Sequence, residues 1–246
     1  MIYKIQHQSY TWLLLITLFF TIIKAFPQQL STSKYGMKVL DNLSLYKESV
    51  RKEPAKNMVE LKKVIPGIVY ELRYAGTNNF LGRAMYPKNT NRTFLRSPAA
   101  EALAMVQKEL NKKNLGLKIY DGYRPYSVTV TFWELIKDER YVADPSKGSG
   151  HNRGLAADLT IIDLSTGKEL DMGTGFDNFS DTAHHTFTSL PNLALNNRKL
   201  LKDTMLKNGF QLFETEWWHY SWPNDKNYEV MDIRFRQLLK NKSEKR

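Results

Sequence analysis

The chain of 246 residues contains no cysteine and only five histidines. The absence of cysteine excludes a disulfide scaffold, and it also excludes any zinc site, iron–sulfur cluster or nucleophile that needs a thiolate. Histidine is scarce enough for each one to be considered individually, at positions 7, 151, 184, 185 and 219. With 42% hydrophobic and 12% aromatic residues, most of the chain is expected to fold, as one large domain or two small ones.

Long apolar runs are also scarce, and the one that stands out lies near the start, at residues 12–23 (WLLLITLFFTII). Lys4 precedes it, and no acidic residue occurs before Asp41. The run is shorter than the roughly 20 residues that cross a bilayer, and a basic start before a short apolar stretch is typical of a secretory signal. We therefore expect a signal peptide over residues 1–25, export to the periplasm or cell envelope, and no stable membrane span after cleavage. An uncleaved N-terminal anchor is the alternative.

Acidic residues are outnumbered, because 25 of them face 36 lysines and arginines and leave a net charge of +11. Removal of residues 1–25 takes away two lysines and no acid, so the mature charge is 34 − 25 = +9. The basic residues are spread along the chain without a zinc-finger, helix-turn-helix or RNP pattern, and we expect no nucleic-acid partner. Anionic envelope polymers or lipid surfaces suit an exported basic protein. A solvated basic surface is an equally good interpretation.

The order of the expected elements predicts an α+β fold. Residues 26–57 are polar and weakly periodic, which indicates a linker or peripheral segment, and a folded domain over 58–240 and a basic tail over 241–246 follow. Ser97 is expected to cap a helix that begins at Pro98, and residues 148–150 read as a flexible loop. Because strands and helices do not alternate regularly, we predict a single domain with a central antiparallel sheet flanked by helices. The expected strands are 68–74, 117–120, 155–163, 210–213 and 217–222, and the expected helices are 97–114, 127–139 and 198–208.

Residues suited to chemistry gather in three short stretches, at 121–125 (DGYRP), 149–158 (SGHNRGLAAD) and 216–219 (EWWH). In an extended chain His151 and Asp158 would lie roughly 23 Å apart, so they can share a metal only if the chain doubles back. The glycines of this stretch permit such a reversal. Asp158 would then lie on an otherwise apolar strand, where a carboxylate needs a cation or a hydrogen-bonding partner.

His219 is the candidate for a third ligand. Two histidines and one carboxylate around Zn²⁺ leave a fourth position for water, which is the composition of a catalytic rather than a structural site. Glu216 is placed to take a proton from that water and to deliver it to a leaving amine. Arg124 is placed to stabilise an oxyanion with its planar guanidinium. From these residues alone, ordinary core histidines and aromatic sheet packing remain an equal alternative.

The combination of the three stretches resembles the VanX-type D-alanyl-D-alanine dipeptidases, which are zinc peptidases. The resemblance rests on their patterns S-x-H-x-x-G-x-A-x-D, E-W-W-H and D-x-Y-R-P, and it runs from about residue 59 to 236. Shorter agreements occur at 72–82, at 171–177 and at the paired histidines 184 and 185. The resemblance implies one Zn²⁺ held by His151, Asp158 and His219. It also implies that Glu216 acts as base and then acid, and that Arg124 stabilises the tetrahedral intermediate.

The same resemblance implies the substrate. Ser149 and Asp177 correspond to positions that hold the dipeptide substrate, and Asp177 is expected to pair with the ammonium group of that dipeptide. Tyr74 and Phe80 correspond to positions that line the pocket. The paired histidines 184 and 185 are expected to support the site without binding zinc. We therefore expect a domain over 58–240 that hydrolyses D-Ala-D-Ala to two D-alanines by a metal-activated water. One alternative is a D,D- or L,D-carboxypeptidase acting on cell-wall stem peptides. Another is a non-catalytic zinc-containing cell-wall-binding module, against which Glu216 argues.

Overall fold

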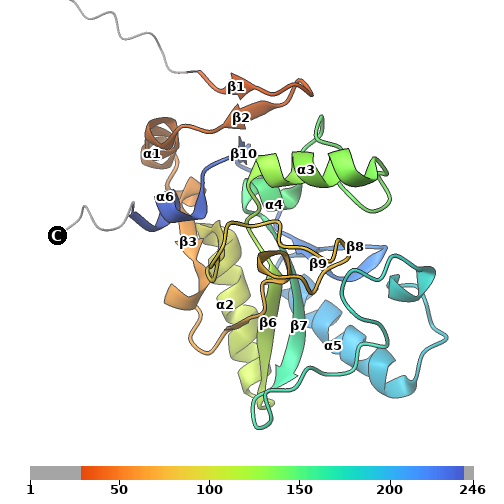
Figure 1. The fold of residues 1–246 in the computed structure, drawn as a ribbon. Coiled ribbons are helices and arrows are strands. Elements are labelled where there is room, and N and C mark those ends of the chain that lie inside the picture. The colour runs from red at the N-terminus through yellow and green to blue at the C-terminus, as the bar shows by residue number, and fades with distance from the viewer. Residues whose placement is uncertain (1–28, 241–246) are drawn as a thin grey trace, which may run out of the picture.

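A five-stranded sheet in the order β4-β6-β7-β9-β8 forms the centre of residues 29–240, the part of the chain that the computed structural model describes (Figure 1). Neighbouring strands are antiparallel except for β4, which pairs in parallel with β6. The α+β prediction is therefore confirmed, with a parallel edge strand in place of a purely antiparallel sheet. The strands are β4 (Val69–Tyr70), β6 (Leu115–Asp121), β7 (Ala156–Asp163), β8 (Gln211–Phe213) and β9 (Glu216–Ser221).

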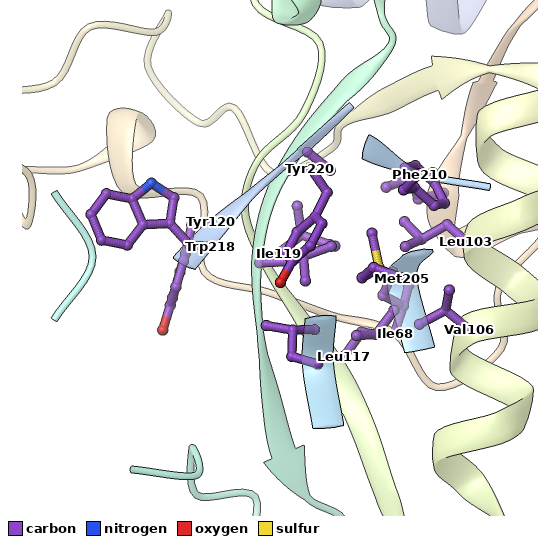
Figure 2. Close-up of a cluster of buried hydrophobic side chains, with 14 of the residues drawn as sticks. Ile68, Leu103, Val106, Leu117, Ile119, Tyr120, Met205, Phe210, Trp218 and Tyr220 are labelled. Carbon is purple, nitrogen blue, oxygen red and sulfur yellow. The ribbon is translucent and has the colours of Figure 1, made fainter. Parts of the chain in front are cut away.

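Two long helices, α2 (Ser97–Asn111) and α5 (Asn192–Lys207), cover one face of this sheet and contact each other. Their apolar side chains meet those of the strands in a buried cluster, while Tyr120 and Trp218 lie on the opposite side of the sheet (Figure 2). Burial of each large apolar side chain contributes about 1.5–3 kcal/mol. The cluster includes Leu103, Val106, Leu117, Ile119, Met205, Phe210 and Tyr220.

The remaining elements surround this central unit. A second, two-stranded sheet pairs β3 with β5. Within residues 29–240, no helix combines the length and the apolar character needed to cross a bilayer. The other strands and helices are β1 (Ser31–Thr32), β2 (Lys38–Leu40), β3 (Met58–Glu60), β5 (Phe94–Arg96), β10 (Val230–Met231), α1 (Leu43–Lys52), α3 (Tyr126–Ile136), α4 (Gly150–Arg153) and α6 (Phe235–Lys240). Short 3₁₀ turns are η1 (Pro54–Lys56), η2 (Leu61–Lys63), η3 (Arg73–Ala75) and η4 (Asp181–Ala183).

The segment expected to be a linker or peripheral is, from residue 29 onward, a packed outer layer (Figure 1). Strand β2 pairs with β1 on one side and with β10, from near the end of the chain, on the other. Leu40 and Tyr46 are buried, and the Tyr46 hydroxyl accepts a hydrogen bond of 2.7 Å from the amide of Met58. These contacts join residues 29–57 to the strands and helices that follow. The expected signal peptide and the basic tail lie outside the described residues.

Several helix boundaries differ from those expected, and three of the differences have a visible cause. Ser97 does not cap α2; Arg96 occupies the cap position, because the Ser97 hydroxyl donates to the Asn57 carbonyl at 3.1 Å. Helix α3 ends three residues early, because Lys137 turns to a left-handed φ of 53°. Helix α5 begins at Asn192 instead of 198. Its asparagine-rich first turns have weak intrinsic helix propensity, so the sequence pattern underestimates its length.

Candidate functional site

The pairing of the central strands brings the first candidate residues together. Asp158 on β7 lies directly opposite His219 on β9, and on its other side it pairs with Asp121 at the end of β6. His151 lies on the short helix α4, which is followed two residues later by β7. Gly154 joins the two with a φ of +70°, a value that favours glycine, so the chain reversal expected from the sequence is present.

Helix α4 is held by its own cap, which corrects the expectation of a flexible loop at residues 148–150. The Ser149 hydroxyl accepts from the Asn152 amide at 3.2 Å, and the Asn152 side chain accepts from the Ser149 amide at 3.0 Å. This reciprocal pair is a capping box with asparagine in place of the usual Glu or Gln. Asn152 also donates to the Arg124 carbonyl at 2.9 Å. The cap therefore fixes the helix that carries His151.

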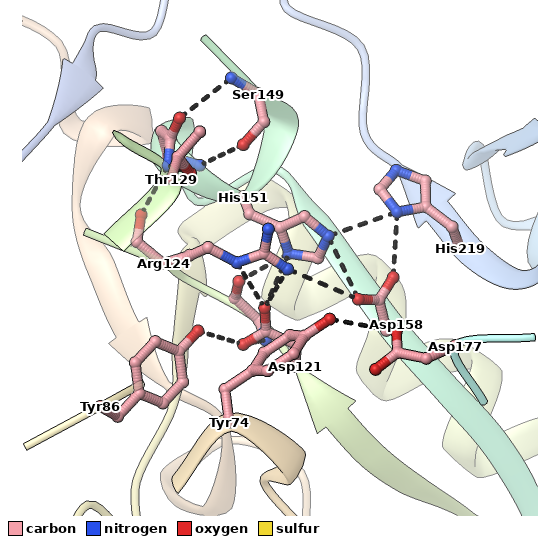
Figure 3. Close-up of polar contacts among 12 residues, drawn as sticks. Tyr74, Tyr86, Asp121, Arg124, Thr129, Ser149, His151, Asp158, Asp177 and His219 are labelled. Atoms are coloured by element: carbon pink, nitrogen blue, oxygen red, sulfur yellow. Dashed lines mark hydrogen bonds and ion pairs between the residues drawn. The ribbon is translucent and has the colours of Figure 1, made fainter. Parts of the chain in front are cut away.

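The three candidate ligands each offer an atom within 4.8 Å of the other two (Figure 3). His151 Nδ1 lies 2.8 Å from the carbonyl oxygen of Gly122 and donates to it, so in the neutral ring Nε2 is the nitrogen without a proton. That Nε2 lies 3.4 Å from Asp158 Oδ2 and 3.3 Å from His219 Nδ1, and His219 Nδ1 lies 2.9 Å from Asp158 Oδ1. Zinc bonds of about 2.0–2.1 Å place two tetrahedral ligands about 3.3 Å apart. The residues therefore fit a zinc ion with nitrogen and oxygen ligands.

The electrostatics of this group keep Asp158 ionised. Its side chain is buried, with 3% exposure, and burial alone would raise the pKa of the carboxyl. The adjoining rings of His151 and His219 outweigh burial and hold this pKa below its usual range. In the metal-free site these rings lower the pKa of Asp158 as charged hydrogen-bond donors. Metal binding requires them to be neutral, and two neutral imidazoles with one carboxylate have a charge of −1, which suits a divalent cation.

Glu216 lies beside the ligand group without belonging to it. Its Oε2 is 3.9 Å from His219 Nδ1, and 19% of its side chain is exposed. Residues three apart on a regular strand point to opposite faces, but the pairing of β8 with β9 shifts register between Leu212 and Phe213, and both side chains reach the same cavity. Burial, reinforced by Asp158 and Asp177, raises the pKa of Glu216 to about 7. A carboxyl with this pKa is suited to take and return a proton at neutral pH.

Arg124 is fixed in place by Asp121, whose part in the site the sequence reasoning missed. Nε and Nη2 of Arg124 donate to one oxygen of the buried Asp121 carboxylate, at 2.9 and 2.7 Å. The guanidinium carbon lies 5.0 Å from the ring centre of Tyr74 and 4.8 Å from that of Phe132. Tyr86 donates to the other oxygen of Asp121. The only sequence signal was the position of Asp121, three residues before Arg124 in the DGYRP stretch.

This geometry leads to a first prediction, for Asp121→Asn. The variant leaves the buried Arg124 with only its longer contact of 4.0 Å to Asp158, and breaking a buried charge pair costs up to about 3–5 kcal/mol of stability. The released guanidinium also loses its fixed orientation, so we expect kcat to fall by about 10- to 100-fold. Denaturant unfolding and steady-state kinetics measure the two effects. Asp203→Asn, which breaks only an exposed pair with Lys199, is the matched control. A variant with unchanged kcat would show that Asp121 does not orient Arg124.

The residues expected to bind substrate line the same cavity as the ligand group. Tyr74 donates its hydroxyl to Asp177 at 3.1 Å, and the amide of Phe80 lies 3.5 Å from the other Asp177 oxygen. Burial, with the negative charge of Asp158, raises the pKa of Asp177 to about 7. A carboxyl in this environment gains stability when a cation binds beside it.

One cavity of about 220 Å³ is lined by every residue that the sequence analysis named as a metal, catalytic or substrate-binding residue. Its lining also contains aromatic side chains that the sequence reasoning did not select, because nothing in their spacing distinguishes them from core residues. Phe213 is among them, half exposed at the cavity and 5.6 Å from His219 between ring centres. The selected residues are Tyr74, Phe80, Arg124, Ser149, His151, Asp158, Asp177, Glu216 and His219, and the additional aromatic ones are Phe132, Tyr141, Phe179, Phe213 and Trp218.

The paired histidines do not line this cavity. The amide of His185 donates to the Glu214 carbonyl at 2.9 Å, in the turn before Glu216, and its ring packs 6.0 Å from that of Tyr220. Burial lowers the pKa of His185 to about 4, so the ring is neutral. His184 lies 3.8 Å from Asp181 near the surface. Neither histidine belongs to the group that could hold a metal, and their supporting role stays a prediction.

Comparison with known proteins places the chain in a family. The profile of the D-Ala-D-Ala dipeptidase family matches residues 54–239. D-alanyl-D-alanine dipeptidase of Escherichia coli (strain K12) is 37% identical over 178 residues, which cover 72% of this chain and 91% of that protein. The dipeptidase of Enterococcus faecalis (strain ATCC 700802 / V583) is 31% identical over 178 residues, covering 65% and 88%. A solved structure of the LdcB LD-carboxypeptidase aligns with a TM-score of 0.41 at 21% identity, over 70% of each chain. From the family match and these two dipeptidases, the chain belongs to the D-Ala-D-Ala dipeptidase family and is a metallopeptidase.

Proposed function

We propose that this protein binds one Zn²⁺ through His151, Asp158 and His219 and hydrolyses D-alanyl-D-alanine to two molecules of D-alanine. The observation that carries the proposal is the position of Glu216, a largely buried carboxyl that lines the same small cavity as the ligand group and stands 3.9 Å from His219 Nδ1 without being one of the three ligands. A volume of about 220 Å³ lies below the range of about 300–1,000 Å³ that is usual for drug-sized ligands, and it suits a dipeptide better than a polymer.

The side chains of the cavity divide the chemistry of peptide hydrolysis among them. Zn²⁺, when bound, supplies Lewis acidity that polarises a carbonyl group and lowers the pKa of water. Glu216 takes the proton from the attacking water and then delivers it to the nitrogen of the departing D-alanine. Arg124, held by Asp121, presents a fixed positive charge to the oxyanion that develops on the scissile carbonyl.

Other residues of the cavity orient the substrate. The Asp177 carboxylate accepts hydrogen bonds from the ammonium group of the dipeptide, and the Tyr74 hydroxyl holds this carboxylate in place by donating to it at 3.1 Å. Binding of the ammonium favours the ionised form of Asp177, so the pKa of about 7 falls when substrate is present. Ser149 lines the same cavity, and its hydroxyl keeps a proton to donate while it caps α4. Phe80 contributes an apolar surface that excludes water.

A comparison of substrates tests this assignment. With zinc-loaded protein, D-alanine is expected to be released from free D-Ala-D-Ala at least about tenfold faster than from a muropeptide ending in D-Ala-D-Ala. L-Ala-L-Ala is the matched control dipeptide and should be a poor substrate. Release from the muropeptide alone would favour the carboxypeptidase alternative. Binding of zinc and of wall fragments without any turnover would favour the non-catalytic module.

Export forms a separate part of the proposal. We propose that residues 1–25 are removed on export to the periplasm or cell envelope, and that residues 58–240 are the catalytic domain. The apolar run at 12–23 and the absence of cysteine support export without oxidative folding. Cell-wall peptides are the accompanying partner class, and nucleic acid is not. Protein purified from the envelope fraction should begin near Phe26 in N-terminal sequencing. A membrane-bound protein that retains Met1 would favour an anchor.

A further inference from the structure

Arg198 on α5 is a buried cation that the mechanism does not use. Only 5% of its surface is exposed, and burial lowers the pKa of its guanidinium. Within residues 29–240 its hydrogen bonds go to backbone and hydroxyl oxygens and to no carboxylate. Asp171 acts on it only electrostatically, and burying a charge without a directly paired opposite charge is costly. The free energy lost by removing this guanidinium from water indicates that Arg198 has a specific role in the fold.

All of these hydrogen bonds lead to one segment, residues 172–184, which connects β7 to α5 and is coloured teal in Figure 1. Apart from the 3₁₀ turn η4, the segment has no regular secondary structure, so few backbone hydrogen bonds of its own define its path. A single planar guanidinium fastens both of its ends, as in a loop that closes on itself. The acceptors are the carbonyls of Met172 at 2.7 Å, Thr182 at 2.9 Å and His184 at 3.2 Å, and the hydroxyl of Thr174 at 3.3 Å.

The middle of this segment reaches the active-site cavity. Asp177 has a φ of +60°, a left-handed conformation that aspartate adopts more readily than most residues other than glycine, and here it turns the chain at the cavity. The neighbouring Phe176 packs 5.4 Å from Trp218 and 6.0 Å from Tyr74, between ring centres. The place of Asp177 in the cavity therefore depends on how the two ends of its segment are held.

A second contact connects the same arginine to the strand that carries Glu216. The Trp217 indole nitrogen donates to the Thr174 hydroxyl at 2.8 Å, and this hydroxyl also accepts from Arg198. The guanidinium carbon of Arg198 lies 5.9 Å from the ring centre of Trp217. Thus α5, the segment 172–184 and the start of β9 meet at one cation.

We propose that Arg198 is a positioning residue for substrate binding, which acts through the segment 172–184 to hold Asp177 against the ammonium group of the substrate. The proposal rests on the function proposed above for Asp177. Arg198 does not line the cavity, so its effect is indirect. Lysine cannot replace it, because a guanidinium offers five N–H donors in one plane and an ammonium offers a single nitrogen.

A double-mutant cycle between Arg198→Lys and Asp177→Asn tests this proposal. Arg198→Lys alone is expected to raise KM for D-Ala-D-Ala about tenfold and to change kcat by less than about threefold. In the Asp177→Asn background, the same change at Arg198 should leave KM nearly unaltered, because the group that it positions is already disabled. Additive effects on KM, or an equal loss of kcat, would overturn the proposal.

Amide hydrogen exchange supplies a readout that does not depend on turnover. Amides of residues 172–184 should exchange faster in Arg198→Lys than in the wild type, with unchanged zinc content. Lys199→Met is the matched control, because Lys199 is the adjacent cation, exposed and paired with Asp203. It should leave kinetics and exchange as in the wild type. Unchanged exchange in Arg198→Lys would overturn the proposal.

An inactive wild-type protein and an unfolded Arg198→Lys variant can each be told apart from failure of the positioning role. If the wild type does not hydrolyse the dipeptide, the proposed function fails, while the exchange experiment still reports on the contact between Arg198 and its segment. If Arg198→Lys does not fold, Thr174→Val removes one acceptor of Arg198, which is also the acceptor of Trp217, and leaves the other three hydrogen bonds of Arg198 intact. That variant is expected to raise KM in the same direction by a smaller factor, and an unchanged KM would count against the proposal.

Discussion

Replacement of Glu216 by glutamine is expected to lower kcat for D-Ala-D-Ala by about 10²- to 10⁴-fold, while the protein keeps its zinc. Glutamine has the same shape as glutamate, but it cannot accept a proton from water or return one to the leaving amine. The metal is retained because Glu216 stands 3.9 Å from His219 Nδ1 and outside the ligand group. Kinetics combined with metal analysis measure both effects. Turnover that survives the substitution would remove Glu216 from the mechanism.

The same variant is expected to be more stable than the wild type above neutral pH. In the metal-free protein, burial raises the pKa of Glu216 to about 7 from the ordinary value of 4.5. The carboxyl therefore imposes no cost below about pH 4.5, and its ionisation destabilises the fold progressively as the pH rises through 7. A shift of this size corresponds to roughly 3 kcal/mol.

Unfolding curves in chelator at pH 4.5 and pH 8 test this sign. Glu216→Gln should match the wild type at the lower pH and exceed it at the higher one. Glu109→Gln is the control, because Glu109 is paired with Lys207 at 2.7 Å on the surface and its pKa is lowered. That variant should gain no stability at pH 8. An equal difference for Glu216→Gln at both pH values would mean that its carboxyl is not a buried, unpaired acid.

The sequence identifies the candidate ligands because their chemistry is restrictive. Without cysteine, only His, Asp and Glu can hold zinc. The glycines around His151 indicate a chain reversal. The strand expected at 155–163 appears as β7 with one residue fewer, since its apolar alternation is set by local composition. The capping box was not anticipated. Asn152 stands where glutamate or glutamine usually marks one, so the stretch read as a flexible loop.

What the sequence does not reveal depends on contacts between distant segments. Tyr86 reaches Asp121 across 35 positions, and no local pattern records such a pair. The Ser97 hydroxyl donates its hydrogen bond to the Asn57 carbonyl, so Ser97 does not cap the helix as expected. Strand β4 has only two residues, too few for alternation to define a partner or a direction. The register shift beside Glu216 likewise follows from the pairing of β8 with β9 and not from their sequences alone.

The second large effect is expected from Asp158→Asn, which should bind zinc far more weakly. Even partners outside the ligand group typically change metal affinity by about 10- to 100-fold, and a lost ligand charge is expected to exceed that. The amide keeps the shape of the side chain between His151 and His219, but it removes the single negative charge of the group. Competition with a chelator measures the affinity, and activity is expected to fall in parallel.

Rescue by excess zinc separates this ligand from the proton-transfer residue. Asp158→Asn should regain part of its activity as zinc is added, because its defect is occupancy, whereas Glu216→Gln should stay inactive at every zinc concentration. His185→Asn is the matched control: His185 is a partly buried, neutral histidine whose side chain does not line the cavity, so its replacement should leave zinc affinity unchanged. Wild-type affinity in Asp158→Asn would place the metal elsewhere. Loss of zinc in His185→Asn would show that the ligand group extends beyond the three residues that the strand pairing brings together.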